Sequence, residues 1–127
     1  MWKIVFLFLA ASFAVGNVTL VGGFRKVDPK DEGVQNALRF AIAEHNRRSN
    51  DMYLSNAAEV IEAQSQVVSG LKYTLTVRMA KTSCRKSAAD ESCPVHSDPE
   101  KARPYICTFT VWSRPWLNDI QLEKQKC

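Results

Sequence analysis

The sequence lacks the features on which most enzymes and nucleic-acid-binding proteins depend. It has only two histidines, no glycine-rich phosphate-binding loop, and an even number of cysteines that leaves no spare thiol as a nucleophile. His45 falls on the apolar side of a helical pattern, where a packing role is expected, and His96 falls in a polar loop. Basic residues are spread along the chain and do not cluster with aromatic residues, which argues against a nucleic-acid partner. The sequence therefore predicts a protein that is not an enzyme, with no cofactor and no metal.

The sequence also has no apolar run long enough to span a membrane. Lys3 precedes an apolar run of roughly 13 uncharged residues, whereas a membrane-spanning helix needs about 20. One positive charge, a short apolar run and small residues from Ala14 onward are typical of a secretory signal peptide. We expect residues 1–16 to be this signal peptide, with cleavage no later than Val18. Residues 17–127 then form a single secreted, extracellular domain.

All four cysteines lie in the C-terminal half of the chain. In a secreted protein they are expected to form two disulfides, and the sequence alone permits three ways of pairing them. The alternative is a zinc site built from Cys84, Cys93, His96 and Cys107. The eight residues between the first two of these cysteines fit no usual zinc motif. We therefore expect disulfides that also include Cys127.

Hydrophobic periodicity predicts one helix followed by four strands. Apolar residues recur at helical spacing from Val34 to His45, which indicates an amphipathic helix over about Pro29–Arg48. Alternation of apolar and polar residues then predicts strands over Val60–Gln66, Tyr73–Met79, Tyr105–Val111 and Ile120–Leu122, with a long surface loop over residues 82–103. The expected fold class is α+β, with a single N-terminal helix wrapped by an antiparallel β-sheet.

Three turn-forming segments rich in apolar and small residues stand out from this pattern. They are Leu20, Val21 and Gly22 of an extended arm; Gln66, Val67, Val68, Ser69 and Gly70 of one hairpin tip; and Pro115 and Trp116 of another. In an antiparallel meander, the arm and both tips can fall at the same end of the sheet. They would then form a wedge. The alternative is that Trp116 belongs to the core and that the first tip is only a turn.

In order and spacing, these segments resemble the three inhibitory elements of the cystatins. The four C-terminal cysteines resemble the secreted type 2 branch of that family, and the resemblance covers essentially the whole chain after the signal peptide. It implies that the cysteines pair as neighbours, Cys84 with Cys93 and Cys107 with Cys127. It also implies a reversible, tight-binding inhibitor that occludes the active-site cleft of papain-like cysteine proteases of the cathepsin type. The arm glycine would be Gly22, preceded by side chains that fill the non-primed pockets.

The resemblance suggests one further property, the residue at position 68 suggests another, and one rival function stays open. Some cystatins inhibit legumain through an exposed asparagine after the helix, and Asn50 matches it; alternatively, Asn50 only ends the helix. Val68 is β-branched and lies in a tight turn, so we expect strain that opening the hairpin would relieve, giving an inactive domain-swapped dimer of an otherwise monomeric protein. The rival is a non-inhibitory secreted cystatin-fold module, antimicrobial or surface-binding. It is disfavoured because the wedge residues are present and a basic cluster is absent.

Overall fold

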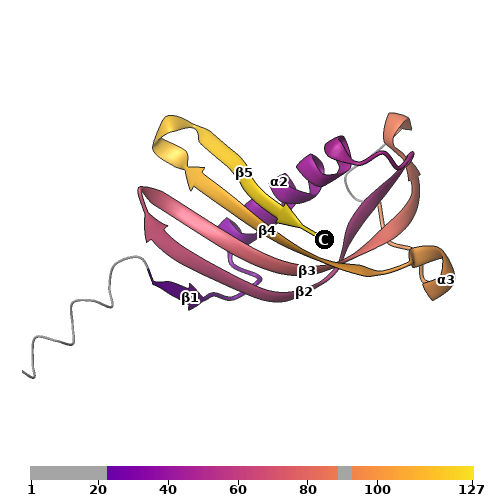
Figure 1. Ribbon diagram of the computed structural model, residues 1–127, viewed down its shortest axis with the longest axis horizontal. Coiled ribbons are helices and arrows are strands. Elements are labelled where there is room, and N and C mark those ends of the chain that lie inside the picture. Colours follow the sequence, from indigo (N-terminus) through magenta and orange to yellow (C-terminus); the bar gives the residue numbers. More distant parts are fainter. Residues whose placement is uncertain (1–22, 89–92) are drawn as a thin grey trace, which may run out of the picture.

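A computed structural model of the chain describes residues 23–88 and 93–127. Five strands form one antiparallel sheet in chain order, and the helix α2 (Glu32–Arg48) lies across one face of it (Figure 1). The strands are β1 (Phe24–Lys26), β2 (Tyr53–Val68), β3 (Gly70–Arg85), β4 (Tyr105–Arg114) and β5 (Asp119–Lys126). A short helix, α3 (Pro99–Ala102), lies in the loop before β4. The predicted fold class is therefore confirmed.

The helix α2 buries the side that its sequence pattern predicts. Its buried residues are Val34, Ala37, Leu38, Ala41 and His45. It begins at Glu32 and not at Pro29 as predicted, because the residues just before it form a turn in which the Asp31 amide donates to the Asp28 carbonyl. Within residues 23–88 and 93–127, no helix combines the length and apolar character needed to cross a bilayer.

The hydrophobic core lies between α2 and the sheet face that it covers. The side chains of Leu75, Val77, Phe109 and Val111 in β3 and β4 have no exposed surface. They alternate with half-buried threonines that point to the other face. Burial of each such apolar side chain is worth about 1.5–3 kcal/mol relative to exposure, so a slip of one residue in the strand register would be costly. This core fixes the position of both ends of β3 and β4.

The predicted number and limits of the strands need correction. β2 begins at Tyr53, whereas alternation predicted a start at Val60. Its pairing with β3 shifts register at three points between Tyr53 and Glu62, and each irregularity breaks the period of two that identifies a strand in the sequence. β1 was missed because its three residues are all exposed and show no alternation. The sheet therefore has five strands and not four.

Two disulfides confirm the predicted pairing of neighbouring cysteines. They join Cys84 to Cys93 and Cys107 to Cys127. The zinc alternative is wrong, because its three cysteine ligands are divided between two disulfides. The first disulfide closes the loop after β3, which continues four residues into the segment predicted as loop and ends at Arg85. On the chain-entropy estimate each cross-link stabilises the fold by roughly 3 kcal/mol.

Candidate functional site

The two predicted hairpin tips project from the same end of the sheet (Figure 1). Ser69 alone connects β2 to β3, and its neighbours Val68 and Gly70 are paired across the turn. β3 pairs with β4 as far as Leu71 and Ser113, so β4 ends beside this turn. The turn from β4 to β5 follows directly. The antiparallel order of the strands therefore brings the two tips together.

The β2–β3 tip requires a glycine at position 70. Gly70 has a φ of +98°, which side chains rarely adopt, and a Cβ atom there would lie 2.4 Å from the carbonyl oxygen of Ser113. The strain predicted at Val68 is not found, because the positive φ of the turn falls on Gly70. Of the other predicted tip residues, Val67 is 63% exposed, Ser69 is exposed, and Gln66 and Val68 are half-buried.

The β4–β5 tip is one 3₁₀ turn, Pro115–Leu117. It is closed by Asn118, which has a φ of +53° and donates its amide to the carbonyl oxygen of Pro115 at 2.9 Å. Trp116 is 62% exposed and Leu117 is 55% exposed. The alternative that Trp116 belongs to the core is therefore wrong. Proline at the first position of the turn also explains why β4 ends at Arg114, since proline has no amide hydrogen for the ladder.

The third predicted segment, the arm with Leu20, Val21 and Gly22, lies outside the described residues, as does the predicted signal peptide. The described chain begins close to the tips. Phe24, the first residue of β1, is paired with Gln66 beside the β2–β3 tip. Strand β1 therefore starts at the same end of the sheet as the two tips.

Three residues that sequence analysis did not single out contact these tips. The Trp112 indole Nε1 donates to the Ser69 carbonyl oxygen at 2.8 Å. The Arg114 guanidinium lies 4.1 Å from the centroid of the Trp112 ring and donates from Nη2 to Oδ2 of Asp119 at 2.6 Å. Hydrogen bonds from Arg114 lower the pKa of the Asp119 carboxyl below its usual value. Because side chains alternate along β4, Trp112 points to the face of the sheet opposite to the buried Val111. This alternation was the one feature of the sequence that could have indicated an exposed position for Trp112.

Asn50 lies at the other end of β2, in the turn between α2 and the sheet. Asn50 is exposed, while its neighbours Ser49 and Asp51 are held by hydrogen bonds and an ion pair. The Asp51 amide donates to Oγ of Ser49 at 3.0 Å, the Asp51 carboxylate forms an ion pair with Lys81, and Lys86 donates to the Ser49 carbonyl oxygen. The hydrogen bond from Lys81 lowers the pKa of Asp51. The structure thus presents Asn50 on a restrained turn that is separate from the two tips.

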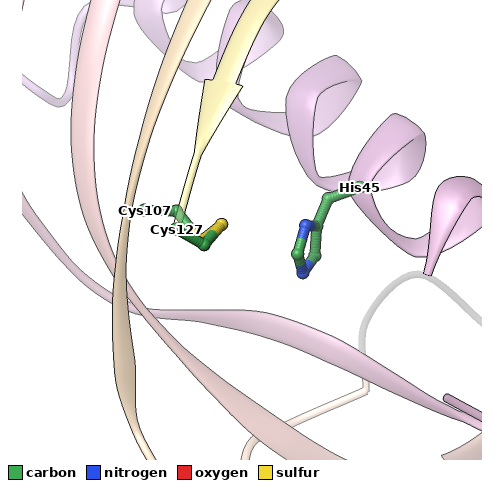
Figure 2. A group of neighbouring side chains, drawn as sticks. All are labelled: His45, Cys107 and Cys127. Atoms are coloured by element: carbon green, nitrogen blue, oxygen red, sulfur yellow. A yellow bond between two sulfur atoms is a disulfide. The ribbon is translucent and has the colours of Figure 1, made fainter. Parts of the chain in front are cut away.

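His45 is a structural residue, as its position in the helical pattern predicted. It is 8% exposed and points toward the Cys107–Cys127 disulfide (Figure 2). Its Nε2 lies 2.8 Å from Tyr105 Oη and its Nδ1 lies 2.7 Å from Gln125 Nε2. The two sulfurs beside it are bonded to each other, so the group offers neither a thiolate nucleophile nor thiolate metal ligands. Burial lowers the pKa of His45, and the nearby charge of Lys86 adds to this effect.

Comparison with known proteins agrees with the fold. The cystatin domain model matches residues 22–116. The chain is 52% identical over 126 residues to a cystatin of Oncorhynchus keta, and the aligned residues cover 99% of this chain and 97% of the relative. It is 53% identical over 128 residues to cystatin-C of Paralichthys olivaceus, with both chains covered completely. The crystal structure of dimeric human cystatin F aligns with a TM-score of 0.77 at 27% identity, over 92% of this chain and 94% of that one.

The chain therefore belongs to the cystatin family, and its two disulfides match the type 2 branch. Cystatins inhibit cysteine proteases and are not enzymes. The buried, hydrogen-bonded position of His45 and the pairing of all four cysteines agree with this class.

Proposed function

We propose that the protein is a reversible, tight-binding inhibitor of papain-like cysteine proteases of the cathepsin type. In this proposal the arm with Leu20, Val21 and Gly22 and the two hairpin tips enter the active-site cleft on both sides of the catalytic thiol. The tip residues concerned are Gln66, Val67, Val68, Ser69, Gly70, Pro115 and Trp116. The observation that supports it is the exposure of Val67 and Trp116 on neighbouring turns at one end of the sheet.

Inhibition would result from occlusion of the cleft and not from slow cleavage of the inhibitor by the protease. The tips are turns, so they offer the catalytic thiol no extended peptide bond in the orientation of a substrate. Trp116 is the largest exposed apolar side chain of the tips, and aromatic side chains bury about 150–250 Å² at such contacts. At about 25 cal/mol per Å² this is worth roughly 4–6 kcal/mol before the entropy of association is subtracted. Trp116 is therefore the expected hot spot.

Titration of papain with the purified protein tests this proposal. The expected result is a stoichiometric loss of activity that is regained on dilution, with the inhibitor recovered uncleaved. Papain activity that is unchanged at a large molar excess of the folded protein would overturn it. Cleavage of the inhibitor in step with the loss of activity would contradict the occlusion mechanism.

A second site that inhibits legumain is proposed at Asn50. It is supported by the exposure of Asn50 between restrained neighbours, because a held loop loses little entropy when a protease binds it. The test compares the parent protein with Asn50→Lys against legumain and against papain. We expect the substitution to abolish legumain inhibition and to leave papain inhibition unchanged. Equal inhibition of legumain by both proteins would remove this second site.

We also propose that the protein is secreted after removal of residues 1–16, which leaves residues 17–127 as the mature domain. The apolar run at the N-terminus and the two disulfides support this proposal, since disulfides form readily on the oxidising secretory route. Mass spectrometry of the protein recovered from culture medium would locate the new N-terminus. Retention in the cells with an intact N-terminus would contradict the proposal.

A further inference from the structure

The carbonyl group of Ser69 is held by a side chain from another hairpin. Ser69 is the single residue between β2 and β3, so its carbonyl lies at the turn itself. The indole of Trp112 in β4 reaches it with a hydrogen bond of 2.8 Å. The indole lies on the outer face of the sheet, where the Arg114 guanidinium is 4.1 Å and the Lys72 amine 6.0 Å from its ring centroid. A side chain that is packed in this way is a fixed donor.

Arg114 extends this link to the second tip. Its Nε and Nη2 donate to Oδ2 of Asp119 at 3.0 and 2.6 Å. Arg114 is the last residue of β4 and Asp119 is the first of β5, so the ion pair closes the base of the β4–β5 tip. Three quarters of each of these two side chains is shielded from solvent, which limits the screening of their attraction.

The backbone contact between the tips is equally close. Gly70 approaches β4 so closely that an added Cβ atom would lie 2.9 Å from Cγ of Arg114, as well as near the Ser113 carbonyl. The last backbone pair that joins the two hairpins is Leu71 with Ser113. Trp112 and Arg114 add side-chain contacts between the two tips, and Lys72 of β3 forms an ion pair with Glu123 of β5 farther from the turns.

We propose that Trp112, Arg114 and Asp119 act as a brace that holds the two tips in the relative position required for binding to a cysteine protease. The brace residues are positioning residues and need not touch the protease. This inference rests on the proposed inhibition by the two tips. Its physical basis is preorganisation: when only a fraction of the molecules has both tips in place, the apparent association rate falls in proportion to that fraction.

The test measures association and dissociation rates with papain for single substitutions. Trp112→Phe keeps the ring but removes the donor to Ser69, and Asp119→Ala releases Arg114. We expect each to slow association by about five- to tenfold, the equivalent of about one net hydrogen bond, with little change in dissociation. Combining them should add little, because either one interrupts the same chain of contacts. Trp116→Ala should instead speed dissociation, because it removes a direct contact.

The matched control is Arg78→Ala. Arg78 of β3 also forms an ion pair with a carboxylate, that of Glu59 in β2, but far from the tips. The Arg78→Ala protein should therefore associate with papain at the same rate as the parent. The brace would be overturned if both Trp112→Phe and Asp119→Ala bound papain at the same rate as the parent while Trp116→Ala dissociated faster. The proposed inhibition by the tips would stand in that case. An equal decrease in Arg78→Ala would also overturn it, because the effect would then not be specific to the tips.

Failure of the proposed function gives a different result, since the parent protein itself would then not inhibit papain. In that case the exchange rate of the Trp112 indole hydrogen, measured by NMR, decides whether the brace exists. A protected indole hydrogen that becomes exchangeable in Asp119→Ala supports it. Rapid exchange in the parent protein overturns it. If Trp112→Phe does not fold, Asp119→Ala provides the same comparison, because Asp119 is not part of the hydrophobic core.

Discussion

At the scale of single residues, Gly70 is a position that cannot accept a side chain without strain. Alanine would have to adopt a φ near +98° and would meet the Ser113 carbonyl. We expect Gly70→Ala to destabilise the fold by about 1–3 kcal/mol and to lower Tm by about 5 °C or more. Thermal unfolding followed by circular dichroism measures this. The control is Ser69→Ala, which keeps the carbonyl that Trp112 binds and should change stability by less than about 0.5 kcal/mol.

Trp116 should affect binding and not stability. Because 62% of Trp116 is exposed, Trp116→Ala removes little buried surface, and Tm should stay within about 2 °C of the parent value. Loss of the proposed hot spot should raise the Ki for papain by about 30-fold or more. Ile106 in β4 is 48% exposed and lies away from the tips, so Ile106→Ala should leave Ki unchanged. A large drop in Tm for Trp116→Ala would contradict the exposed position of the indole.

His45 should make the protein less stable in mild acid. The imidazole lies within hydrogen-bond distance of Tyr105 Oη at Nε2 and of Gln125 Nε2 at Nδ1. Burial opposes a second proton on the ring, and the charge of Lys86 opposes it as well.

The lowered pKa of His45 determines the sign of this effect. At a pH between the lowered pKa of the folded protein and the usual pKa of about 6.5, the unfolded chain binds the extra proton more readily than the folded protein does. The contribution of His45 to stability is therefore present above about pH 6.5 and is lost as the pH falls from there toward the pKa of the folded protein. Urea unfolding at pH 7.5 and pH 5.0 should show this decrease in the parent protein and a smaller decrease in His45→Gln. Identical decreases in both proteins would show that other groups are responsible.

Single residues also show what could be predicted from the sequence. The requirement for glycine at Gly70 and the exposed position of Trp116 follow from local chemistry: a turn needs positive φ, and a tryptophan directly after a strand-ending proline lies in a turn. The contacts of Trp112 with Ser69 could not be predicted in the same way. They depend on the register between β3 and β4, which aligns residues more than 40 positions apart in the chain.

At the scale of elements, the long β2–β3 hairpin is the part most suited to exchange between molecules. Each strand has 16 residues, and Ser69 alone connects them. If the turn opened into one continuous strand, the pairs within the hairpin could re-form with a second molecule, and Gly70 would no longer need a positive φ.

We predict that mild heating produces a domain-swapped dimer that no longer inhibits papain, because the β2–β3 tip is consumed in the extended strand. Gel filtration of heated and unheated protein, with papain titration of each fraction, measures this. Legumain inhibition provides an internal control, since the proposed Asn50 site lies outside the exchanged turn. A heated sample that contains only active monomer would contradict the prediction.

The elements were predicted unevenly, for identifiable reasons. Helix α2 and strands β3 and β4 have regular apolar periods, so their type and buried side were predictable. The start of β2 was not, because its three register shifts disturb the alternation between Tyr53 and Glu62. The strand β1 has no buried side chain and exists through its pairing with β2, which no local pattern reveals.

At the scale of the whole molecule, the two proposed protease sites lie at opposite ends of β2. The β2–β3 tip lies at the Val68 end of this strand with the β4–β5 tip beside it, and Asn50 precedes Tyr53 at the other end. We predict that one molecule binds papain and legumain at the same time. The Ki for legumain, measured with free inhibitor and with inhibitor saturated by inactivated papain, should agree within about twofold. A value raised by tenfold or more would show that the two enzymes compete for overlapping surfaces.

The position of the chain end at Cys127 has a practical consequence. Lys126 pairs with Thr108, well back along β4 from Ser113 at the tips, and the disulfide to Cys107 holds the last residue there. A fluorophore or affinity handle appended after Cys127 would lie away from the two tips. The same handle placed ahead of Phe24 would lie close to the β2–β3 tip, so a test of the proposed inhibition with immobilised protein is best built from its carboxyl side.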